Sequence, residues 1–400
     1  MARKICFLSL NLYMHGGIQR LMPVLLNELC KNEEVTVVMP YDERKDKNIY
    51  GISNKVNIVN FNLFPHYNKK NVRDIFSYLI YRVNKKTAIF DTYLGRKILK
   101  NNIFPKKQLI AIQQYINLKE FDIVVGVADY FSLLLSYISQ DIKSLTLGWQ
   151  HNTFDMYFNV RGKNSYGLLN IFKEKCKILD GIIVLTDKDK ISFEKIIDVP
   201  IYRLYNPVSF SPIQNYGDRT KPLIFVGRLY KQQKGLDYLL KIIKLLVEKK
   251  EKIKIYIVGD GKDKLSFQES IKKERLETNI ILAGGTNDVE KYYKNASVFL
   301  HTSRHEGFGI VIVEAMSYGI PVVAFHNNGP DEIIENNKQG YLVEKWDIED
   351  FVNKVIKLLD DEETYNRFSV NSKARSKDFS SEIFVREFNE IINNIEKNTR

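Results

Sequence analysis

The feature that most constrains the fold is a series of short apolar, β-branched runs that alternates with helical patterns along the chain. Strands that read as continuously apolar are typically buried on both faces, and strands separated by helices build parallel sheets. We therefore predict an α/β protein made of βαβ units in doubly wound parallel sheets. The runs interpreted as strands are residues 5–10, 35–39, 56–59, 123–127, 144–147, 182–185, 223–226, 253–258, 280–283, 297–300 and 321–325.

The series of strands breaks once, in a segment around Asn206-Pro207 that is rich in turn residues. A length of 400 residues with 44% apolar content suits two domains, each with its own core. We place a Rossmann-like domain at residues 1–204, a linker at 205–220, a second Rossmann-like domain at 221–380 and a last helix at 381–400. Because ligands of such folds bind beyond the carboxyl ends of the strands, the loops that follow strands are the candidate functional segments.

One such loop carries two carboxylates eight positions apart, Glu306 and Glu314, around a glycine-rich turn. The pattern predicts Glu306 in a strand-to-helix loop and Glu314 within the helix, roughly 10 Å apart, which is close to the distance between the sugar and the ribose of a nucleotide sugar. The backbone amides of Phe308 and Gly309 lie where a helix begins and favour negative charge. We interpret the loop as a donor-sugar site. The alternative is a helix-start carboxylate at Glu306 and a surface glutamate at Glu314.

Two cations follow another predicted strand, Arg228 directly after it and Lys234 just before an amphipathic helix. Arg228 offers a bidentate fork and Lys234 a point charge, so together they are suited to neutralising a diphosphate. A solvated loop is the alternative.

Three further loops follow strands and carry weaker signals. Residues 11–20 contain Gly16-Gly17, which let the backbone approach a phosphate or sugar, and Arg20, which can add a cation; a tight turn explains the glycines equally well. His151 ends a strand and is a candidate hydrogen-bond partner for a hexose hydroxyl, although a lone histidine is more often structural. Residues 327–332 either line the same pocket or cap a helix.

The sequence offers little for a metal or a disulfide framework. Cys6, Cys30 and Cys176 are too few and too scattered, so we expect small core residues in a reducing cytoplasm. Asp187 and Asp189 match an Asp-x-Asp metal motif, but they follow a strand and open a helix, and we expect exposed helix-start carboxylates. We predict no metal site. No stretch reaches the roughly 18 apolar residues that span a bilayer.

The net charge of +12 lies almost entirely in residues 1–220, which hold 31 basic and 20 acidic side chains against 29 and 28 in residues 221–400. Residues 66–107 are the most basic part, with interleaved aromatic side chains. Such a stretch suits an anionic membrane surface or a phosphate-bearing partner, with nucleic acid as the competing partner. The alternative is a solvated basic face whose aromatic residues belong to the core.

Taken together, these motifs resemble the GT-B retaining glycosyltransferases of glycosyltransferase family four. The matching segments are Gly16-Gly17-x-x-Arg20, residues 180–186, Asn206-Pro207-Val208, Gly227-Arg228-Leu229 with Lys234-Gly235, residues 258–261, and residues 296–342 with the Glu-x7-Glu pair. The resemblance implies two Rossmann-like domains facing across a cleft, with acceptor binding in the first and nucleotide-sugar binding in the second. It also implies that the last helix crosses back to the first domain. Gln19 departs from the pattern, because many relatives carry Glu there.

By motif position, the resemblance implies that Arg228 and Lys234 bind the donor diphosphate and stand in for a metal. It implies that Glu314 binds the ribose, and that Glu306 with the amides of Phe308 and Gly309 binds the sugar. Gly17 would approach the donor phosphate and His151 the sugar. Among these residues the catalytic set is Glu306, His151, Arg228 and Lys234, and no separate cofactor is expected.

We therefore expect a metal-independent hexosyltransferase that uses a UDP-linked hexose or N-acetylhexosamine to build capsule or another cell-envelope polysaccharide. Its acceptor would be lipid-linked or a surface glycan, and the enzyme would lie in the cytoplasm, peripherally at the inner face of the membrane, with no nucleic-acid partner. Transfer to protein or teichoic acid is the second hypothesis. An inactive glycosyltransferase-like subunit is the third, although the complete donor set speaks against it. A nicotinamide-dependent oxidoreductase is disfavoured because no full dinucleotide fingerprint is present.

Overall fold

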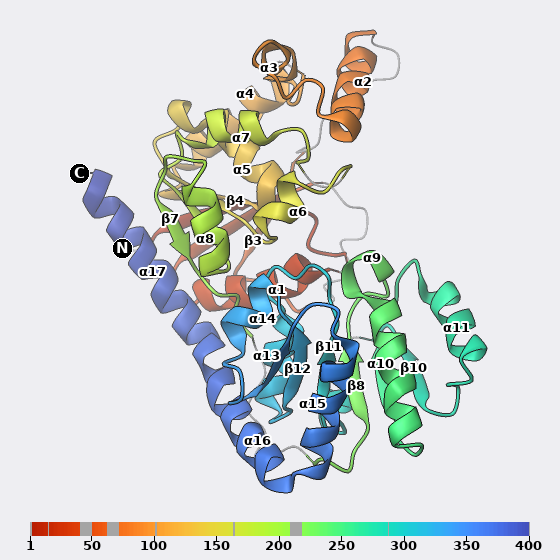
Figure 1. Cartoon of the computed structure of the whole chain (residues 1–400). Helices are drawn as coiled ribbons and strands as arrows, with labels where there is room; N and C mark the ends of the chain where they lie inside the picture. Colours follow the sequence, from red (N-terminus) through yellow and green to blue (C-terminus); the bar gives the residue numbers. More distant parts are fainter. Residues whose placement is uncertain are drawn as a thin grey trace. The chain divides into compact units, whose positions relative to one another are not determined.

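The computed structural model describes residues 2–14, 16–40, 50–61, 72–100, 102–162, 165–208, 218–286 and 288–399 (Figure 1). The chain divides into two compact units. Unit 1 comprises Met1–Pro207 together with Ser381–Arg400, and unit 2 comprises Val208–Ser380. Most of the linker predicted at 205–220 lies outside the described residues, as do His15 and the first part of the basic stretch, residues 66–71.

Unit 1 is built on a seven-stranded sheet in the order β3-β2-β1-β4-β5-β6-β7, in which every pair of neighbours is parallel. The strands are β1 Lys4–Leu8, β2 Glu34–Met39, β3 Asn57–Asn60, β4 Ile123–Val127, β5 Leu145–Trp149, β6 Gly181–Val184 and β7 Ile201–Arg203. The helices are α1 Gly17–Leu29, α2 Val72–Thr87, α3 Tyr93–Lys100, α4 Lys106–Lys119, α5 Ala128–Ser136, α6 Phe154–Phe158, α7 Leu169–Cys176, α8 Asp187–Glu194 and α17 Ser381–Thr399, with a 3-10 turn at Ser139–Asp141.

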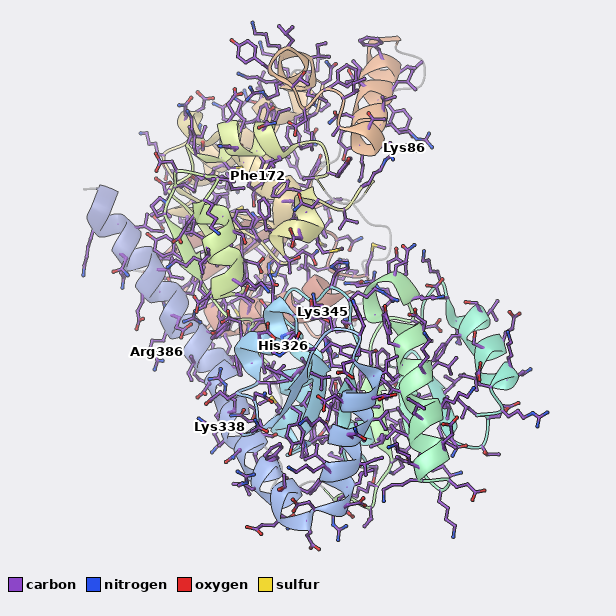
Figure 2. The ribbon with its side chains drawn as sticks, viewed as in Figure 1. Lys86, Phe172, His326, Lys338, Lys345 and Arg386 are labelled. Carbon is purple, nitrogen blue, oxygen red and sulfur yellow. The ribbon has the colours of Figure 1, made fainter. Side chains whose placement is uncertain are left out.

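The core of unit 1 forms because the central strands are apolar on both faces. All five residues of β4 are buried, and the helices that cover the sheet add large side chains such as Phe172, which Figure 2 labels. Cys6 and Cys176 belong to this core, and Cys30 is also buried, so the expectation that the cysteines act as small core residues is confirmed.

The last helix, α17, belongs to unit 1 although it follows unit 2 in the sequence. It packs on α1, and the Phe384 ring stacks on Trp149 with 5.8 Å between ring centroids. The Arg3 guanidinium donates a hydrogen bond to Asn389. The prediction that the C-terminal helix crosses back to the first domain is therefore confirmed.

Unit 2 contains a six-stranded, fully parallel sheet in the order β10-β9-β8-β11-β12-β13. The strands are β8 Leu223–Val226, β9 Ile255–Val258, β10 Ile280–Gly284, β11 Phe299–His301, β12 Val322–Phe325 and β13 Gly340–Val343. The helices are α9 Lys231–Lys234, α10 Leu236–Lys249, α11 Lys264–Lys273, α12 Glu290–Tyr293, α13 Ile310–Ser317, α14 Asn328–Ile333, α15 Ile348–Asp360 and α16 Glu362–Ser376, with a 3-10 turn at Lys377–Phe379.

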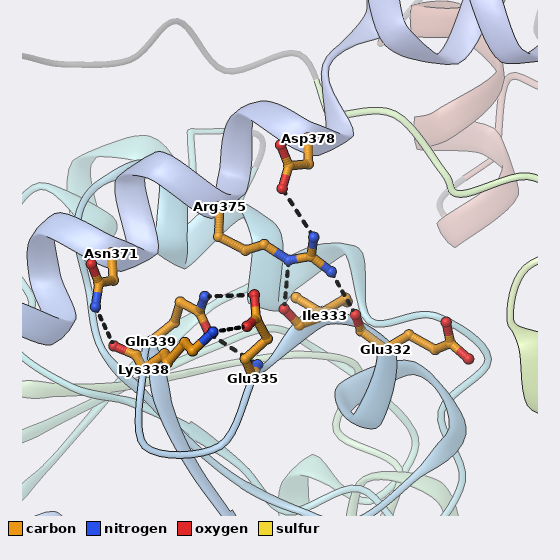
Figure 3. Close-up of polar contacts among 8 residues, drawn as sticks. All are labelled: Glu332, Ile333, Glu335, Lys338, Gln339, Asn371, Arg375 and Asp378. Atoms are coloured by element: carbon orange, nitrogen blue, oxygen red, sulfur yellow. Dashed lines mark hydrogen bonds and ion pairs between the residues drawn. The ribbon is translucent and has the colours of Figure 1, made fainter.

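A polar contact between α16 and the end of α14 fixes one side of unit 2 (Figure 3). The Arg375 guanidinium donates to the backbone oxygens of Glu332 at 2.8 Å and Ile333 at 3.2 Å, and it pairs with Asp378 at 2.9 Å. Asn371 donates to the backbone oxygen of Lys338 at 3.1 Å. The bonds from Arg375 satisfy carbonyl groups at the end of α14 and hold that helix in place, whereas the bond from Asn371 holds the loop before β13.

All eleven predicted strands overlap observed ones, and the fold class of two parallel Rossmann-like sheets is confirmed. Among the residues that the structure describes, two strands were not predicted. β7 has three residues after Pro200 and ends in Arg203, and β13 begins at Gly340, so neither forms a long apolar run. Among the described residues, no helix is long and apolar enough to cross a membrane.

The basic stretch fits only in part the alternative in which its aromatic residues belong to the core, where Tyr81 and Phe90 pack against it. Phe104 is buried, but Phe76, Tyr78 and Tyr93 are 61%, 40% and 73% exposed. For these three aromatic residues the core interpretation is wrong.

Candidate functional site

The loop that carries Glu306 joins β11 to α13 in unit 2. Gly309 precedes α13 with φ +96°, a left-handed conformation that side chains other than hydrogen rarely adopt. A Cβ atom there would also lie 3.0 Å from Cδ1 of Ile312. The glycine therefore allows the chain to turn sharply from the loop into the helix, with Glu306 in the loop and Glu314 in the helix, as predicted.

The loop after β12 packs against this loop. A Cβ atom at Gly329 would lie 1.8 Å from the backbone oxygen of Phe308, so glycine is required for the close approach. The Asn327 amide donates to the backbone oxygen of Ser303 at 2.7 Å. Residues 327–332 thus support the Glu306 loop and begin α14, but the Asn327 side chain does not cap that helix, and pocket lining by this segment stays a prediction.

Three donors converge on one oxygen of the Glu306 carboxylate, Oε2. Nζ of Lys234 lies 2.5 Å from this atom, Nε2 of His301 3.0 Å and Oγ of Ser303 3.2 Å. The side chains of Lys234 and Glu306 are 12% and 13% exposed. Lys234 and Glu306, predicted separately from segments 72 positions apart, therefore meet as a largely buried ion pair.

The electrostatics of this cluster keep the carboxylate ionised. Burial alone would raise the pKa of Glu306, but the Lys234 charge and the His301 hydrogen bond outweigh it and hold the pKa well below its usual range. Burial lowers the pKa of His301, partly offset by Glu306. His301 is therefore neutral, and it donates from Nε2, because a proton on the buried Nδ1 would have no acceptor among the described residues.

Glu314 is not the surface glutamate of the alternative interpretation, because it is only 2% exposed. Its Oε2 accepts a hydrogen bond of 2.8 Å from the hydroxyl of Tyr293, which is itself buried and stacked on Tyr318. A buried carboxylate needs such a donor, so Tyr293 is a functional candidate that sequence reasoning missed.

The two predicted cations have different environments. Lys234 ends α9, and its Cε atom lies 3.5 Å from the position that a Cβ would take at Gly227, so the loop folds back over the start of the segment. The alternative interpretation, a solvated loop, is therefore wrong for Lys234. The Arg228 side chain is exposed and makes no hydrogen bond or ion pair within the described parts of the chain.

Gly17 and His151 belong to unit 1. Gly17 is the first residue of α1, and a Cβ atom there would meet nothing within 4 Å. The Gln19 amide donates to the backbone oxygen of Asn11 at 3.3 Å, which closes the loop around the glycines. His151 follows β5 beside the Trp149 ring, and burial lowers its pKa to about 3, so it is neutral. Its Nε2 is buried without a partner among the described residues.

Arg304 braces the Glu306 loop and was also missed. Its guanidinium forms two hydrogen bonds with the Asp237 carboxylate, at 2.9 and 2.7 Å, and lies 4.3 Å from the centre of the Tyr238 ring. A bidentate pair combined with ring stacking restricts the loop more than a single ion pair does. The sequence signal that could have identified Arg304 is its position next to the Glu-x7-Glu pattern.

The Asp-x-Asp segment is only partly as expected. Asp187 is exposed and lies 3.5 Å from Arg203, but Asp189 is buried. The Asp189 carboxylate accepts hydrogen bonds from the Thr186 hydroxyl at 2.7 Å and the Phe154 amide at 3.0 Å. These two bonds join the starts of α8 and α6. Within the described ranges, no group of three or more His, Cys, Asp or Glu side chains is arranged to hold a metal ion.

The chain is similar to known glycosyltransferases. Residues 211–375 match the family described as Glycosyl transferases group 1. An uncharacterized glycosyltransferase of Haemophilus influenzae is 28% identical over 395 residues, which is 98% of this chain and all of that protein. The poly(ribitol-phosphate) alpha-N-acetylglucosaminyltransferase of Staphylococcus aureus is 29% identical over 306 residues, covering 71% of this chain and 60% of the relative.

Among solved structures, a TarM mutant of S. aureus in complex with fondaparinux, alpha-GlcNAc-glycerol and UDP superposes with a TM-score of 0.74. The match covers 98% of this chain and all of that chain at 17% identity, which establishes the shared GT-B fold. The chain therefore carries a glycosyl transferases group 1 domain at residues 211–375 and has the GT-B fold.

Proposed function

We propose that this glycosyltransferase moves a hexose or N-acetylhexosamine from a UDP-linked donor, with retention of configuration, to a growing cell-surface glycan. The observation that carries the proposal is the buried pair between Lys234, at the end of α9, and Glu306, in the loop that leads to Glu314. A cation, a sugar-binding carboxylate and a second buried carboxylate in this order suit the three parts of a nucleotide sugar: diphosphate, hexose and ribose.

In the proposed reaction, the anomeric C–O bond of the donor breaks and negative charge develops on the departing diphosphate. Lys234 and Arg228 neutralise that charge, which is the role that a metal ion takes in other sites. Lys234 carries three protons on Nζ, so it can donate to a phosphate while it keeps its bond to Glu306. The acceptor hydroxyl attacks from the same face and gives its proton to the leaving phosphate, so no side chain acts as a nucleophile.

Glu306 positions the hexose. With Oε2 occupied by three donors, Oε1 is the oxygen left to accept a hydrogen bond from a sugar hydroxyl. The amides of Phe308 and Gly309 supply further donors at the start of α13. We propose that His151 and Gly17, in unit 1, contribute to the sugar and the phosphate.

We propose a lipid-linked or surface-glycan acceptor bound by unit 1, with the enzyme at the cytoplasmic face of the membrane. The surplus of basic side chains in residues 1–220 supports an anionic acceptor or surface. The name of the S. aureus relative, a poly(ribitol-phosphate) transferase, favours teichoic acid as the second candidate acceptor.

A donor panel tests the proposal. Purified protein is incubated with several nucleoside-diphosphate sugars without added metal, and release of free nucleoside diphosphate is followed together with thermal stabilisation. We expect slow hydrolysis or stabilisation with one UDP-sugar and loss of both in Glu306→Gln.

The matched control is Glu274→Gln, because Glu274 forms an exposed pair with Lys244 and should retain activity. If the folded wild-type protein shows neither hydrolysis nor stabilisation with any donor, the result would instead favour an inactive partner subunit.

A further inference from the structure

Helices α2 and α3 of unit 1 each present an apolar face to solvent. On α2 the exposed residues Ile75, Phe76, Leu79 and Val83, at 41%, 61%, 50% and 45%, recur at the spacing that places side chains on one side of a helix. On α3, Tyr93 and Leu94 are each 73% exposed and Ile98 is 43% exposed. Soluble surfaces rarely gather so many large apolar side chains, so we infer a partner for these two helix faces, together called the α2–α3 surface below.

The opposite sides of these helices are anchored, so the apolar faces are held outward. Asn84 of α2 is 1% exposed, donates to the backbone oxygen of Gly167 at 2.7 Å and accepts from the amide of Phe90 at 2.9 Å. The segment before α3 is tied to α7, because Asn170 donates to the backbone oxygen of Asp91 at 3.0 Å. Figure 1 draws α2 and α3 at the same end of unit 1, and only residues 88–92 join them.

Basic side chains border the apolar residues. Residues 75–107 contain eight Lys and Arg and a single acid, Asp91. On α2, Arg82 and Lys86 lie at helical spacing from Ile75 and Leu79, and Figure 2 shows Lys86 at the surface. On α3, Lys97 follows Tyr93 by one turn and its ammonium lies 5.9 Å from the centre of that ring. Long basic side chains can bury their stems against lipid while the charged ends reach phosphate groups.

We propose that the α2–α3 surface docks on an anionic lipid bilayer. Apolar side chains enter the boundary between headgroups and acyl chains, and the bordering Lys and Arg contact lipid phosphates. A second copy of the chain fits poorly, because it would bring the same positive charges against this face. A nucleic acid or acidic polymer fits less well, because Phe76 and Tyr93 offer rings for stacking but the aliphatic Ile75, Leu79, Val83, Leu94 and Ile98 would gain no apolar environment from it.

The inference deepens the proposed function, since it names the contact that would bring a lipid-linked acceptor to the enzyme. The inference rests on the proposed function only where it assigns a lipid-linked acceptor to the enzyme. The contact itself follows from exposure and charge.

Vesicle co-sedimentation of the full chain tests the apolar part. We expect binding to phosphatidylcholine vesicles that contain phosphatidylglycerol, weak binding without it, and release by salt. The triple variant Phe76→Ser, Leu79→Ser and Leu94→Ser should bind at least tenfold more weakly. The matched control is Leu118→Ser, Ile191→Ser and Leu265→Ser, because these residues are 78%, 53% and 74% exposed elsewhere, and it should bind like the wild type.

A second variant tests the charges. Arg82→Gln, Lys86→Gln and Lys97→Gln should weaken binding by roughly fivefold per residue, whereas Lys241→Gln, Lys252→Gln and Lys272→Gln should not. Absence of binding to anionic vesicles, or equal binding by the apolar variant and its control, would overturn the proposal. So would a vesicle-independent dimer that the serine variant converts to a monomer, since the occupant would then be a second copy.

Donor hydrolysis without vesicles separates this proposal from the proposed function. The surface variants should hydrolyse the donor like the wild type, because none of the replaced residues is in the donor site. Vesicle binding without any hydrolysis would leave the docking surface standing and refute the function, and hydrolysis without binding would do the reverse.

Discussion

Replacing Lys234 by Met should reveal how strongly the Lys234–Glu306 pair is coupled. Both side chains are nearly buried, at 12% and 13% exposure, and removing one partner of a buried pair typically costs about 3–5 kcal/mol, because the other charge is left without compensation. His301 and Ser303 still donate to Glu306 in the variant. We therefore expect a loss near the lower limit, about 3 kcal/mol in the free energy of unfolding of unit 2.

The pH dependence of this loss has a definite sign. In the wild type the pKa of Glu306 is lower in the folded than in the unfolded state, so the pair stabilises the protein above the unfolded value of about 4.5 and less as pH falls. Without Lys234, burial dominates and raises the pKa of Glu306. Protonation then relieves the buried charge, so the destabilisation of Lys234→Met should shrink between pH 7 and about pH 5.

Urea unfolding can isolate unit 2 because the chain has two tryptophans, Trp149 in unit 1 and Trp346 in unit 2. In a Trp149→Phe background, fluorescence reports on unit 2 alone. The control Lys244→Met breaks an exposed pair and should leave the free energy of unfolding nearly unchanged at either pH. Adding Glu306→Gln to Lys234→Met should recover most of the stability. A cost below about 1 kcal/mol for Lys234→Met, or one that grows on acidification, would refute the coupling.

Three further perturbations have expected outcomes. Tyr293→Phe removes the hydroxyl that holds Glu314, and kinetics with the active donor should show at least a tenfold loss of kcat/KM, since hydrogen bonds to charged groups contribute about 1.5–3 kcal/mol; an unchanged value would contradict the role of Tyr293. Gly329→Ala places a Cβ against the Phe308 backbone oxygen, so thermal unfolding should begin at lower temperature and donor hydrolysis should fall; wild-type behaviour in both would show that the contact can relax. The pKa of His151 falls to about 3 on folding, so it opposes folding as pH drops below about 6.5, and His151→Gln should flatten the loss of stability in acid denaturation; an unchanged slope would mean that His151 is not buried as a neutral ring.

The fold was predictable from the sequence because its signals are local. Continuous apolar runs and the glycine before α13 each depend on a few neighbouring residues, and they located eleven strands and the Glu306 loop. Short edge strands such as β7 were missed because three residues of mixed polarity carry no periodic signal.

The chemistry of the site was less predictable, because it depends on which loops the sheet brings together. Spacing suggested that Lys234 and Glu306 bind parts of one ligand, but their direct contact spans 72 positions and requires that β8 and β11 be neighbours. Tyr293 is 21 positions from Glu314 and has no motif of its own. His301 was not predicted as a site residue, because the predicted strand at 297–300 stops one residue before it. The binding and catalytic roles assigned to the site residues all stay predictions: Gly17, His151, Arg228, Lys234, Glu306, Phe308, Gly309 and Glu314.

The membership of α17 in unit 1 has a consequence for how the chain acquires its structure during synthesis. Domains usually fold in the order in which they emerge from the ribosome. Here residues 208–380 emerge complete while unit 1 still lacks the helix whose Phe384 stacks on Trp149. Unit 2 can therefore finish folding first. Until α17 is synthesised, part of the apolar surface of unit 1 stays uncovered. A ribosome that stalls before residue 381 would hold a chain in which the N-terminal unit is the immature one.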